Sequence, residues 1–418
     1  MPTPRQAALS MLNQVLAEGR LMSEPAALRA LEGLDAPSKA RALRLANETL
    51  RNLERADKLL KPHLRKEPAS YVMNLLRLAT IELAQGGDAH GVVNEAVALL
   101  SKHKKYGAMK GLANAVLRKI AADAVEKIKI LRAPRLPKWL RGPLTEAYSS
   151  EIMGQIELAH LAGAPLDISV KSDAPAWAEK LGGTLTPFGS IRLQDAGQVT
   201  ALAGFEAGEW WVQDTAAALP AALLKAKIGE TVLDMCCAPG GKTMQLAATG
   251  ATVTALDASE SRLARVRENL TRTRLAATLL CEDALTHEGT YDAVLLDAPC
   301  SATGTIRRHP DLPHAKTGEE FGALIELQAQ MLAHAAGLVK SGGRLVFCTC
   351  SLLPDEGEVQ VEEFLDMHPD FTADTSVLAH EGVDPAWITE EGGLRLRPDY
   401  FSAIGGMDGF YMAVLNRA

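Results

Sequence analysis

Two cysteines in the C-terminal half are the residues best suited to covalent chemistry. Cys300 lies in the run Asp297-Ala-Pro-Cys-Ser301, and Cys350 lies in the run Thr349-Cys-Ser351. A thiolate adds reversibly to an electron-poor ring carbon, and a second thiol can assist the step that follows. Carbon 5 of cytosine becomes nucleophilic only after such an addition at carbon 6. The two cysteines therefore favour methylation of a cytosine through a covalent adduct.

Asp297 could serve the same reaction from beside the two thiols. Its carboxylate can hydrogen-bond the Watson-Crick edge of the base and favour protonation at N3 as the adduct forms. Two other interpretations of the cysteines stay open: buried structural residues, or zinc ligands taken from Cys236-Cys237 and Cys348-Thr-Cys350. Both pairs lack the roughly two to four intervening residues that are usual between zinc ligands, so we expect no metal.

A second motif predicts cofactor binding. An apolar strand leads into Asp234-Met-Cys-Cys-Ala-Pro-Gly-Gly-Lys-Thr243, whose two glycines let a ligand approach the backbone amides where a helix begins. The next strand ends at Asp257, where a carboxylate can bind the hydroxyls of a ribose. The third ends at Glu282-Asp283, where methyltransferases hold an adenine amino group. Because the dinucleotide fingerprint G-x-G-x-x-G is absent, the pattern favours S-adenosylmethionine over a nicotinamide cofactor.

The elements that would position these groups alternate between strand and helix after Gly229. The pattern predicts strands that are each followed by a helix, at 231–233, 252–256, 278–281, 293–296 and 344–348. Such alternation is typical of a parallel sheet covered on both faces, with its ligand site at the carboxyl ends of the strands. The last two of these strands should be neighbours, which would bring Cys300 and Cys350 to one pocket. A final strand at 409–415 is expected to pair antiparallel at the sheet edge.

The first 130 residues predict an all-helical domain with an excess of positive charge. Apolar residues recur three and four positions apart, as in Leu75, Leu76, Ala79 and Leu83. This part holds 21 Lys and Arg against 13 Asp and Glu, a balance of +8, whereas the whole chain carries -7. A polyanion should therefore be bound mainly here. Basic clusters at 51–66 and 102–110 could hold phosphates, or they could be solvated faces.

The part between these two regions predicts a linker followed by a small α+β module. The run Arg132-Ala-Pro-Arg-Leu-Pro-Lys-Trp-Leu140 contains two prolines that break regular structure. After it the pattern predicts a helix, a strand, a second helix and a second strand, at 151–162, 166–170, 174–181 and 190–193. The sequence thus predicts three domains, at 1–130, 131–225 and 226–418.

Composition excludes several classes of protein. Hydrophobic residues make up 47% and charged residues 23% of the 418 residues, which is typical of a folded globular chain. No apolar run approaches the roughly 20 residues of a membrane span, and the first residues lack the layout of a secretory signal. We therefore expect a cytoplasmic protein without a membrane partner. Six cysteines in a chain of this length form no disulfide framework.

Taken together, these motifs resemble those of the Sun/Fmu family of RNA (cytosine-5)-methyltransferases, in its RsmB-like branch. The family signatures are similar to D-x-C-x-A-P-G-G-K, D-A-P-C-S-x-x-G and T-C-S, and the likeness covers about residues 205–418. It extends through 303–311, 341–344 and 406–411. The helical N-terminal part resembles the NusB-like RNA-binding domain that precedes this catalytic unit in the bacterial branch acting on small-subunit ribosomal RNA.

The resemblance implies an all-α NusB-like domain, a small α+β module and an α/β Rossmann-like methyltransferase domain. It implies that Cys350 is the nucleophile and that Cys300 is the thiol that helps to release the product. It also implies a set of residues that bind S-adenosylmethionine, namely Cys236, Cys237, Ala238, Pro239, Gly240, Gly241, Lys242, Asp257, Asp283 and Asp297.

The expected substrate is a cytosine of 16S ribosomal RNA. The base must be unstacked to reach a cysteine, which favours a loop or a junction over an intact RNA helix. A transfer-RNA cytosine-5 methyltransferase is one alternative, because it would share the catalytic motifs. An RNA-binding assembly factor with a vestigial site is another, although the intact cysteine pair argues against it. We expect the protein to act as a monomer.

Overall fold

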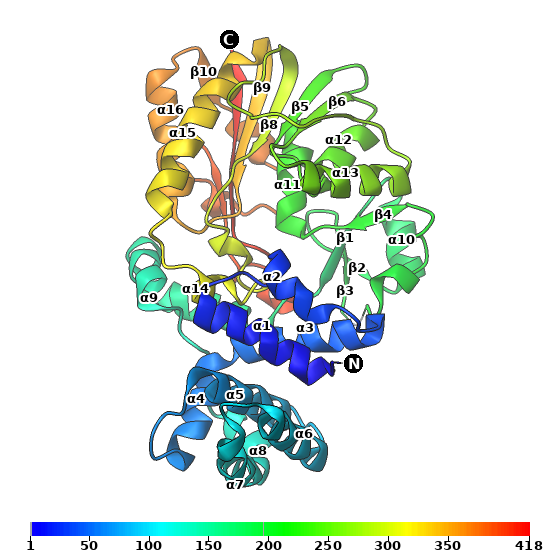
Figure 1. Cartoon of the computed structure of the whole chain (residues 1–418). Coiled ribbons are helices and arrows are strands. Elements are labelled where there is room, and N and C mark those ends of the chain that lie inside the picture. Colours follow the sequence, from blue (N-terminus) through cyan, green and yellow to red (C-terminus); the bar gives the residue numbers. More distant parts are fainter. Residues whose placement is uncertain (1, 195) are drawn as a thin grey trace. The chain divides into compact units, whose positions relative to one another are not determined.

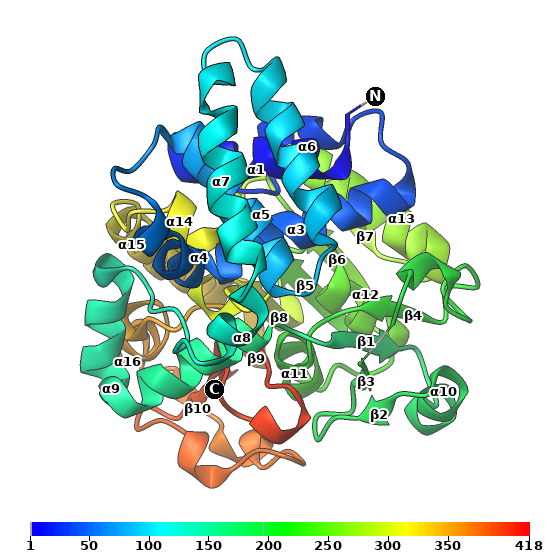
Figure 2. The same cartoon turned by 90° about the horizontal axis from the view of Figure 1, so that it is seen from below.

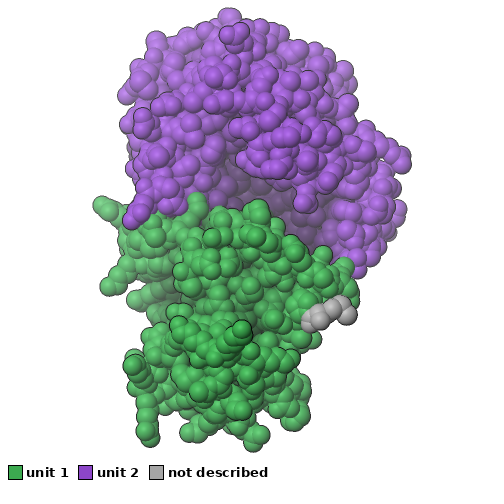
Figure 3. All heavy atoms as spheres, viewed as in Figure 1, with its two compact units in different colours: residues 1–162, 306–318 green, residues 163–305, 319–418 purple. Residues whose placement is uncertain are grey.

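The computed structural model describes residues 2–194 and 196–418, which form two compact units (Figure 1, Figure 3). Unit 1 contains the residues up to Ala162 together with Ile306–Gly318. Unit 2 contains Gly163–Thr305 and Glu319–Ala418. The boundaries of the three expected domains stay a prediction. No helix in the described residues is long and apolar enough to cross a membrane.

Every regular element described in unit 1 is helical. Its α-helices are α1 (Pro4–Glu18), α2 (Pro25–Leu28), α3 (Ala36–Arg51), α4 (Leu53–Leu60), α5 (Ser70–Ala84), α6 (Ala89–Lys102), α7 (Lys110–Ala121), α8 (Ala124–Lys129), α9 (Lys138–Ala162) and α14 (Leu312–Ala315). Shorter turns of 3-10 helix include η2 (Lys61–His63) and η3 (Gly107–Met109). The expected all-helical N-terminal domain is confirmed.

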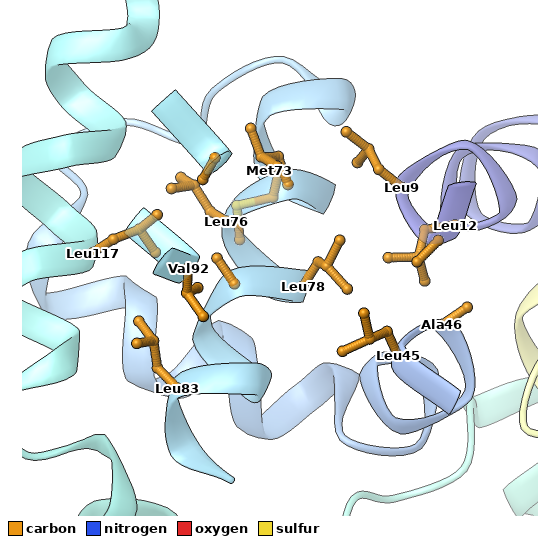
Figure 4. Packing of buried hydrophobic residues seen from close by; sticks show 14 of the residues in the cluster. Leu9, Leu12, Leu45, Ala46, Met73, Leu76, Leu78, Leu83, Val92 and Leu117 are labelled. Carbon is orange, nitrogen blue, oxygen red and sulfur yellow. The ribbon is translucent and has the colours of Figure 1, made fainter. Parts of the chain in front are cut away.

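Local signals and one apolar core account for these helices. The Thr3 hydroxyl accepts a hydrogen bond from the Gln6 N–H at 3.2 Å and so caps the start of α1. Gly19 ends the helix in the left-handed conformation, with φ of 64°. Leucines that recur at helical spacing on α1, α3 and α5, such as Leu12 and Leu76, pack into a buried cluster (Figure 4).

The expected linker and the helix after it differ from the structure. The sequence predicted a helix only at 151–162, but α9 begins at Lys138. Ser149 has a φ of 79° and a ψ of 160°, so α9 consists of two helical segments joined by one non-helical residue. The linker was predicted from the prolines of the run 132–140, but α9 begins within that run, directly after its second proline, and continues through Pro143.

Unit 2 begins with a small antiparallel sheet in the order β2-β3-β1-β4. Its elements are β1 (Leu166–Val170), α10 (Ala174–Leu181), β2 (Thr184–Leu185), β3 (Ile191–Leu193) and β4 (Trp210–Val212). Inside it the Arg192 guanidinium donates two hydrogen bonds of 2.7 Å to the Asp167 carboxylate, and both side chains are buried. This small module contains both strands that the sequence predicted.

The second sheet of unit 2 has eight strands in the order β10-β12-β9-β8-β5-β6-β7, with β11 also paired to β12. The strands are β5 (Thr231–Met235), β6 (Thr252–Leu256), β7 (Thr278–Leu280), β8 (Tyr291–Asp297), β9 (Val339–Thr349), β10 (Phe371–Ala373), β11 (Leu394–Leu396) and β12 (Phe410–Arg417). The strands from β9 to β7 in this order run parallel, and β12 is antiparallel to β9. The expected Rossmann-like sheet is confirmed.

Helices cover both faces of this sheet because successive strand residues point to opposite sides. In β5, Val232 packs into one buried cluster and Leu233 into another. The first cluster includes residues of α11 (Thr215–Leu224), α12 (Gly241–Ala248) and α13 (Glu260–Thr273). The second includes residues of α15 (Phe321–Gly337) and α16 (Glu358–Met367), which lie on the other side of the sheet (Figure 1).

Three details of the sheet correct the sequence prediction. β12 is antiparallel as expected but is not the edge, because the short strand β10 pairs with its other side. The segment between β7 and β8 forms turns instead of the expected helix. Cys281 was expected inside the third strand, but β7 ends at Leu280 and Cys281 is exposed just beyond it.

Candidate active site

Cys300 and Cys350 meet beyond the carboxyl ends of two neighbouring strands. β8 ends at Asp297 and β9 ends at Thr349, and these strands run parallel beside each other (Figure 1). The two sulfurs lie 3.5 Å apart, which is within hydrogen-bond distance for sulfur. Both side chains are partly exposed. The structure thus brings together the two thiols that the sequence singled out.

A hydrogen bond joins the thiols of Cys300 and Cys350, and either sulfur can be its donor. The hydrogen bond to Cys350 raises the pKa of Cys300 well above its ordinary value, and burial raises it further. Cys300 is therefore a neutral thiol near neutral pH.

Backbone contacts hold the two cysteine loops against each other. The Gly304 N–H donates to the Cys350 carbonyl at 2.9 Å, and the Gly409 N–H donates to the Gly304 carbonyl at 2.8 Å. A Cβ on Gly304 would collide with the backbone of Gly409, so only glycine fits at position 304. Motif segments that lie far apart in the sequence therefore meet beside Cys350.

A buried carboxylate that the sequence analysis missed fixes the loop that carries Cys300. Glu356 is fully buried and accepts hydrogen bonds from the Ser301 N–H at 2.8 Å and from the Gln328 amide at 3.0 Å. The Ser301 hydroxyl also donates to Glu356, and Gln328 donates to the Pro299 carbonyl at 2.8 Å. Residues on both sides of Cys300 are thus tied to one buried network. The signal in the sequence that could have indicated Glu356 is its place as an acidic residue shortly after the T-C-S motif.

Asp297 is paired with a buried lysine from the glycine-containing loop. Lys242 Nζ lies 2.8 Å from one carboxylate oxygen, and the Cys348 thiol lies 3.6 Å from the other. Burial lowers the pKa of Lys242, but Asp297 and the neighbouring cysteines raise it by more, so the net shift is upward. Lys242 therefore stays charged beside Asp297, 5.1 Å from the centre of the Phe410 ring.

Two buried carboxylates at adjacent strand ends have oxygens that can accept hydrogen bonds from a ligand. Asp234 is fully buried, and its Oδ2 accepts a hydrogen bond of 2.5 Å from the Thr243 hydroxyl. Asp257 is also buried, and its Oδ1 accepts from the Ser259 N–H at 3.0 Å. The other oxygen of Asp234 is buried and has no hydrogen-bond partner within the described residues. The other oxygen of Asp257 is also buried, and it forms an ion pair of 3.3 Å with Nη1 of the exposed Arg262 side chain. Hydroxyl or ammonium donors of a bound S-adenosylmethionine can hydrogen-bond these oxygens.

The loop Cys236–Lys242 connects β5 to α12 in a tight turn. Gly240 has a φ of 99°, and a Cβ there would lie 3.0 Å from the Val266 side chain. Ala238 and Pro239 form the outer part of the turn, and Gly241 opens α12. Burial raises the pKa of Cys236 to about 12 and that of Cys237 further, so both are neutral thiols.

Asp283 lies apart from these buried acids. It follows the end of β7 by three residues and is exposed, and its Oδ1 accepts a hydrogen bond of 3.0 Å from the Leu285 N–H. Its role in holding the adenine amino group stays a prediction. Across residues 2–194 and 196–418, no three His, Cys, Asp or Glu side chains are grouped so that they could hold a metal ion.

The doubly covered sheet, its antiparallel β12 and the acidic ends of β5 and β6 define the class of protein as an S-adenosylmethionine-dependent methyltransferase. Comparison with known families refines this class. A family model described as 16S rRNA methyltransferase RsmB/F matches residues 221–416, and a model of the NusB family matches residues 2–122.

Individual relatives agree with these models along nearly the whole chain. Ribosomal RNA small subunit methyltransferase B of Vibrio cholerae is 34% identical, over 99% of this chain and 97% of that protein. The protein of the same name from Pseudomonas putida is 37% identical over 78% of each chain. The crystal structure of PH0851 has the same fold, with a TM-score of 0.76 and 22% identity over 100% of this chain and 99% of that one. The chain belongs to the family of ribosomal RNA small subunit methyltransferases B.

Proposed function

We propose that this protein transfers a methyl group from S-adenosylmethionine to carbon 5 of a cytosine in 16S ribosomal RNA, through an adduct between Cys350 and carbon 6. The observation that carries the proposal is the separation of 3.5 Å between the sulfurs of Cys300 and Cys350. Two thiols this close can act on the two adjacent carbons of one pyrimidine ring. The NusB match and the names of the relatives support ribosomal RNA as the substrate.

The first chemical step belongs to Cys350. Its thiolate forms the bond to carbon 6, and the electron pair of the ring double bond moves toward carbon 5. Lys242 lies close enough to the cysteines for their charges to interact, so its ammonium can stabilise negative charge on the attacking sulfur. The thiol of Cys300 lies within hydrogen-bond distance of this sulfur, at 3.5 Å.

Asp297 orients the base and stabilises the form of the base that is protonated at N3. Its carboxylate can accept from the exocyclic amino group, and also from N3–H once N3 takes up a proton from solvent as the adduct forms; that proton neutralises the negative charge that the attack puts into the ring. The ion pair with Lys242 at 2.8 Å holds this carboxylate in place. When bound, S-adenosylmethionine supplies the electrophilic methyl group.

Release of the product requires a base, and Cys300 fills this role. After methylation the hydrogen on carbon 5 must leave as a proton. Cys300 first gives up its own thiol proton to solvent, and its thiolate then accepts the proton from carbon 5. The electron pair of the broken C–H bond restores the ring double bond, and the bond between carbon 6 and Cys350 breaks. Cys350 recovers its thiolate. The high pKa of Cys300 makes it a strong base for this step.

Bisulfite sequencing of RNA from a bacterium that lacks this gene tests the proposal. One 5-methylcytosine should disappear from 16S ribosomal RNA, and expression of the wild-type chain, but not of Cys350→Ala, should restore it. Loss of a 5-methylcytosine from transfer RNA would indicate the alternative substrate. Unchanged methylation in all RNA would contradict catalysis and favour an assembly factor.

A further inference from the structure

Two segments of unit 1 together form a positively charged surface that we call the basic face, residues 61–71 and 102–112. It carries a set of exposed basic side chains: Lys61, Arg65, Lys66, Lys102, Lys104, Lys105 and Lys110. Glu67 is the one acidic residue in these segments. Within the described part of the chain none of these cations takes part in an ion pair, whereas Lys58, Lys127 and Lys129 of the same unit do. The charge of the face is therefore not neutralised by the protein itself.

Three aromatic rings lie within this charged surface. The ring centres of Tyr71 and His103 are 4.4 Å apart, and those of His103 and Tyr106 are 4.7 Å apart, with Tyr71 and Tyr106 nearly parallel. All three side chains are half-buried. Lys105 Nζ lies 5.4 Å from the centre of the Tyr106 ring. Aromatic groups interleaved with cations are typical of surfaces on which nucleotide bases stack.

The rings are held in a defined arrangement. His103 Nδ1 accepts hydrogen bonds from the backbone N–H groups of Lys105 and Tyr106, at 3.2 and 3.3 Å. These bonds fix the turn between α6 and α7, two helices that pack against each other (Figure 2). Because the turn is ordered before any ligand binds, less conformational entropy is lost on binding.

A groove runs between the two segments that form the face. It has a volume of about 510 Å³ and is lined by residues 63–69 of one segment and by Met109 and Leu112 of the other. Arg65, Lys66 and Glu67 are among its lining residues, and the same two segments continue to Tyr71 and Tyr106. A groove lined by cations, between segments that also carry aromatic rings, can follow an extended polyanion.

We propose that the basic face binds a single-stranded segment of the substrate RNA, with phosphates on its lysines and arginine and a base stacked on the Tyr71, His103 and Tyr106 rings. The proposal rests on the proposed function in taking RNA as the partner. Single-stranded RNA fits better than a duplex, because the bases of a duplex are not free to stack on side chains. The observed charge complements RNA and disfavours a basic protein as the partner.

Binding of a labelled RNA of alternating cytidine and adenosine to the full-length chain, without S-adenosylmethionine, tests this proposal. Tyr106→Leu keeps an apolar side chain against the core but removes the ring, and it should weaken binding by roughly tenfold. Tyr106→Phe keeps the ring and should bind as the wild type does. Thermal unfolding of each variant shows whether it is folded.

A double charge reversal tests the role of the phosphates. Lys104→Glu with Lys105→Glu should lower the slope of log K against log salt concentration by about 1.4, since each phosphate contact to a single strand contributes about 0.7. The matched control is Lys39→Glu with Lys119→Glu, which makes the same charge change at exposed positions of unit 1 outside the face. The control should leave the slope nearly unchanged.

Several outcomes would overturn the proposal. Equal slopes for the two double variants would mean that the lysines act only through net charge. Unchanged RNA affinity of Tyr106→Leu would mean that no base stacks on this ring. Unchanged RNA affinity of all variants would mean that the basic face does not bind RNA and contacts a protein partner instead. Because the assay needs no turnover, it can succeed or fail independently of the experiment on methylation.

Discussion

The strand ends of unit 2 and the basic face of unit 1 hold their polar groups in opposite ways. At and just beyond the strand ends, Lys242 and Glu356 are buried and Asp297 is partly exposed, and each has specific partners at hydrogen-bond distance. On the basic face the cations are exposed, and each is one of several similar charges. A buried polar group has no substitute for its partner, whereas an exposed charge is partly replaced by its neighbours and by salt. Single changes should therefore have large effects in the first region and small, salt-dependent effects in the second.

The largest effect is expected from Cys350→Ala. Without the thiolate no bond to carbon 6 forms, so the rate of methyl transfer to 16S ribosomal RNA should fall by about 10⁴-fold or more. The affinity for RNA and its salt dependence should not change, because the basic face is intact. Incorporation of labelled methyl groups measures the rate. A residual rate within about tenfold of the wild type would remove Cys350 from the mechanism.

The elements near these cysteines show what the sequence can predict. β1 and β6 were predicted with their observed bounds, because β-branched runs between breakers are local signals. The meeting of Cys300 and Cys350 followed from the parallel order of β8 and β9. The pairing of β10 with β12 could not be predicted in this way, since a three-residue strand has almost no local pattern.

The contacts inside the site were harder to predict than its position. That Lys242 binds the cofactor stays a prediction, and the sequence did not indicate that its Nζ pairs with Asp297, 55 positions further along the chain. Glu356 was missed because its burial depends on Gln328, which belongs to α15. Contacts of this kind depend on which elements pack together. A motif gives the place of a site, and tertiary packing gives the partners of each side chain.

The second prediction concerns the pH dependence of stability at the strand ends. Burial raises the pKa of Asp234 from 3.8 to about 7, so the folded protein keeps a proton that the unfolded chain has lost. Stability should therefore fall as the pH rises from about 4 to about 7, and then level off. Between about pH 5 and pH 8, Asp234→Asn should gain about 2 to 3 kcal/mol relative to the wild type in urea unfolding.

Parallel stability profiles for the wild type and Asp234→Asn would contradict this assignment. The basic face provides the contrast, because its exposed cations have no buried carboxyl partner. Lys104→Glu with Lys105→Glu should leave the shape of the profile unchanged over the same pH range.

The third prediction concerns the buried carboxylate that holds the loop of Cys300. Glu356→Gln replaces a charged acceptor with a neutral amide, so the bonds from Ser301 and Gln328 weaken. The free energy of unfolding should fall by about 2 kcal/mol, and the rate of product release should fall with it. Urea unfolding and single-turnover kinetics measure these changes. Glu362→Gln, which alters an exposed acid of α16, is the control and should change neither quantity.

The smallest of these effects is expected at the cofactor site. Asp257→Ala removes the buried carboxylate that we assign to the ribose hydroxyls, and it should weaken S-adenosylmethionine binding by about 1.5 kcal/mol, or roughly tenfold. Calorimetry on the folded variant measures the affinity. An unchanged affinity would place the ribose elsewhere.

The covalent cycle through two thiols is tested most directly by the adduct between protein and RNA on denaturing gels. Cys300→Ala should still attack carbon 6 but cannot remove the proton from carbon 5, so a labelled adduct should accumulate in the presence of S-adenosylmethionine. Cys350→Ala and the double variant should form none. An adduct with Cys350→Ala and none with Cys300→Ala would reverse the two roles, and normal turnover in both variants would contradict covalent catalysis.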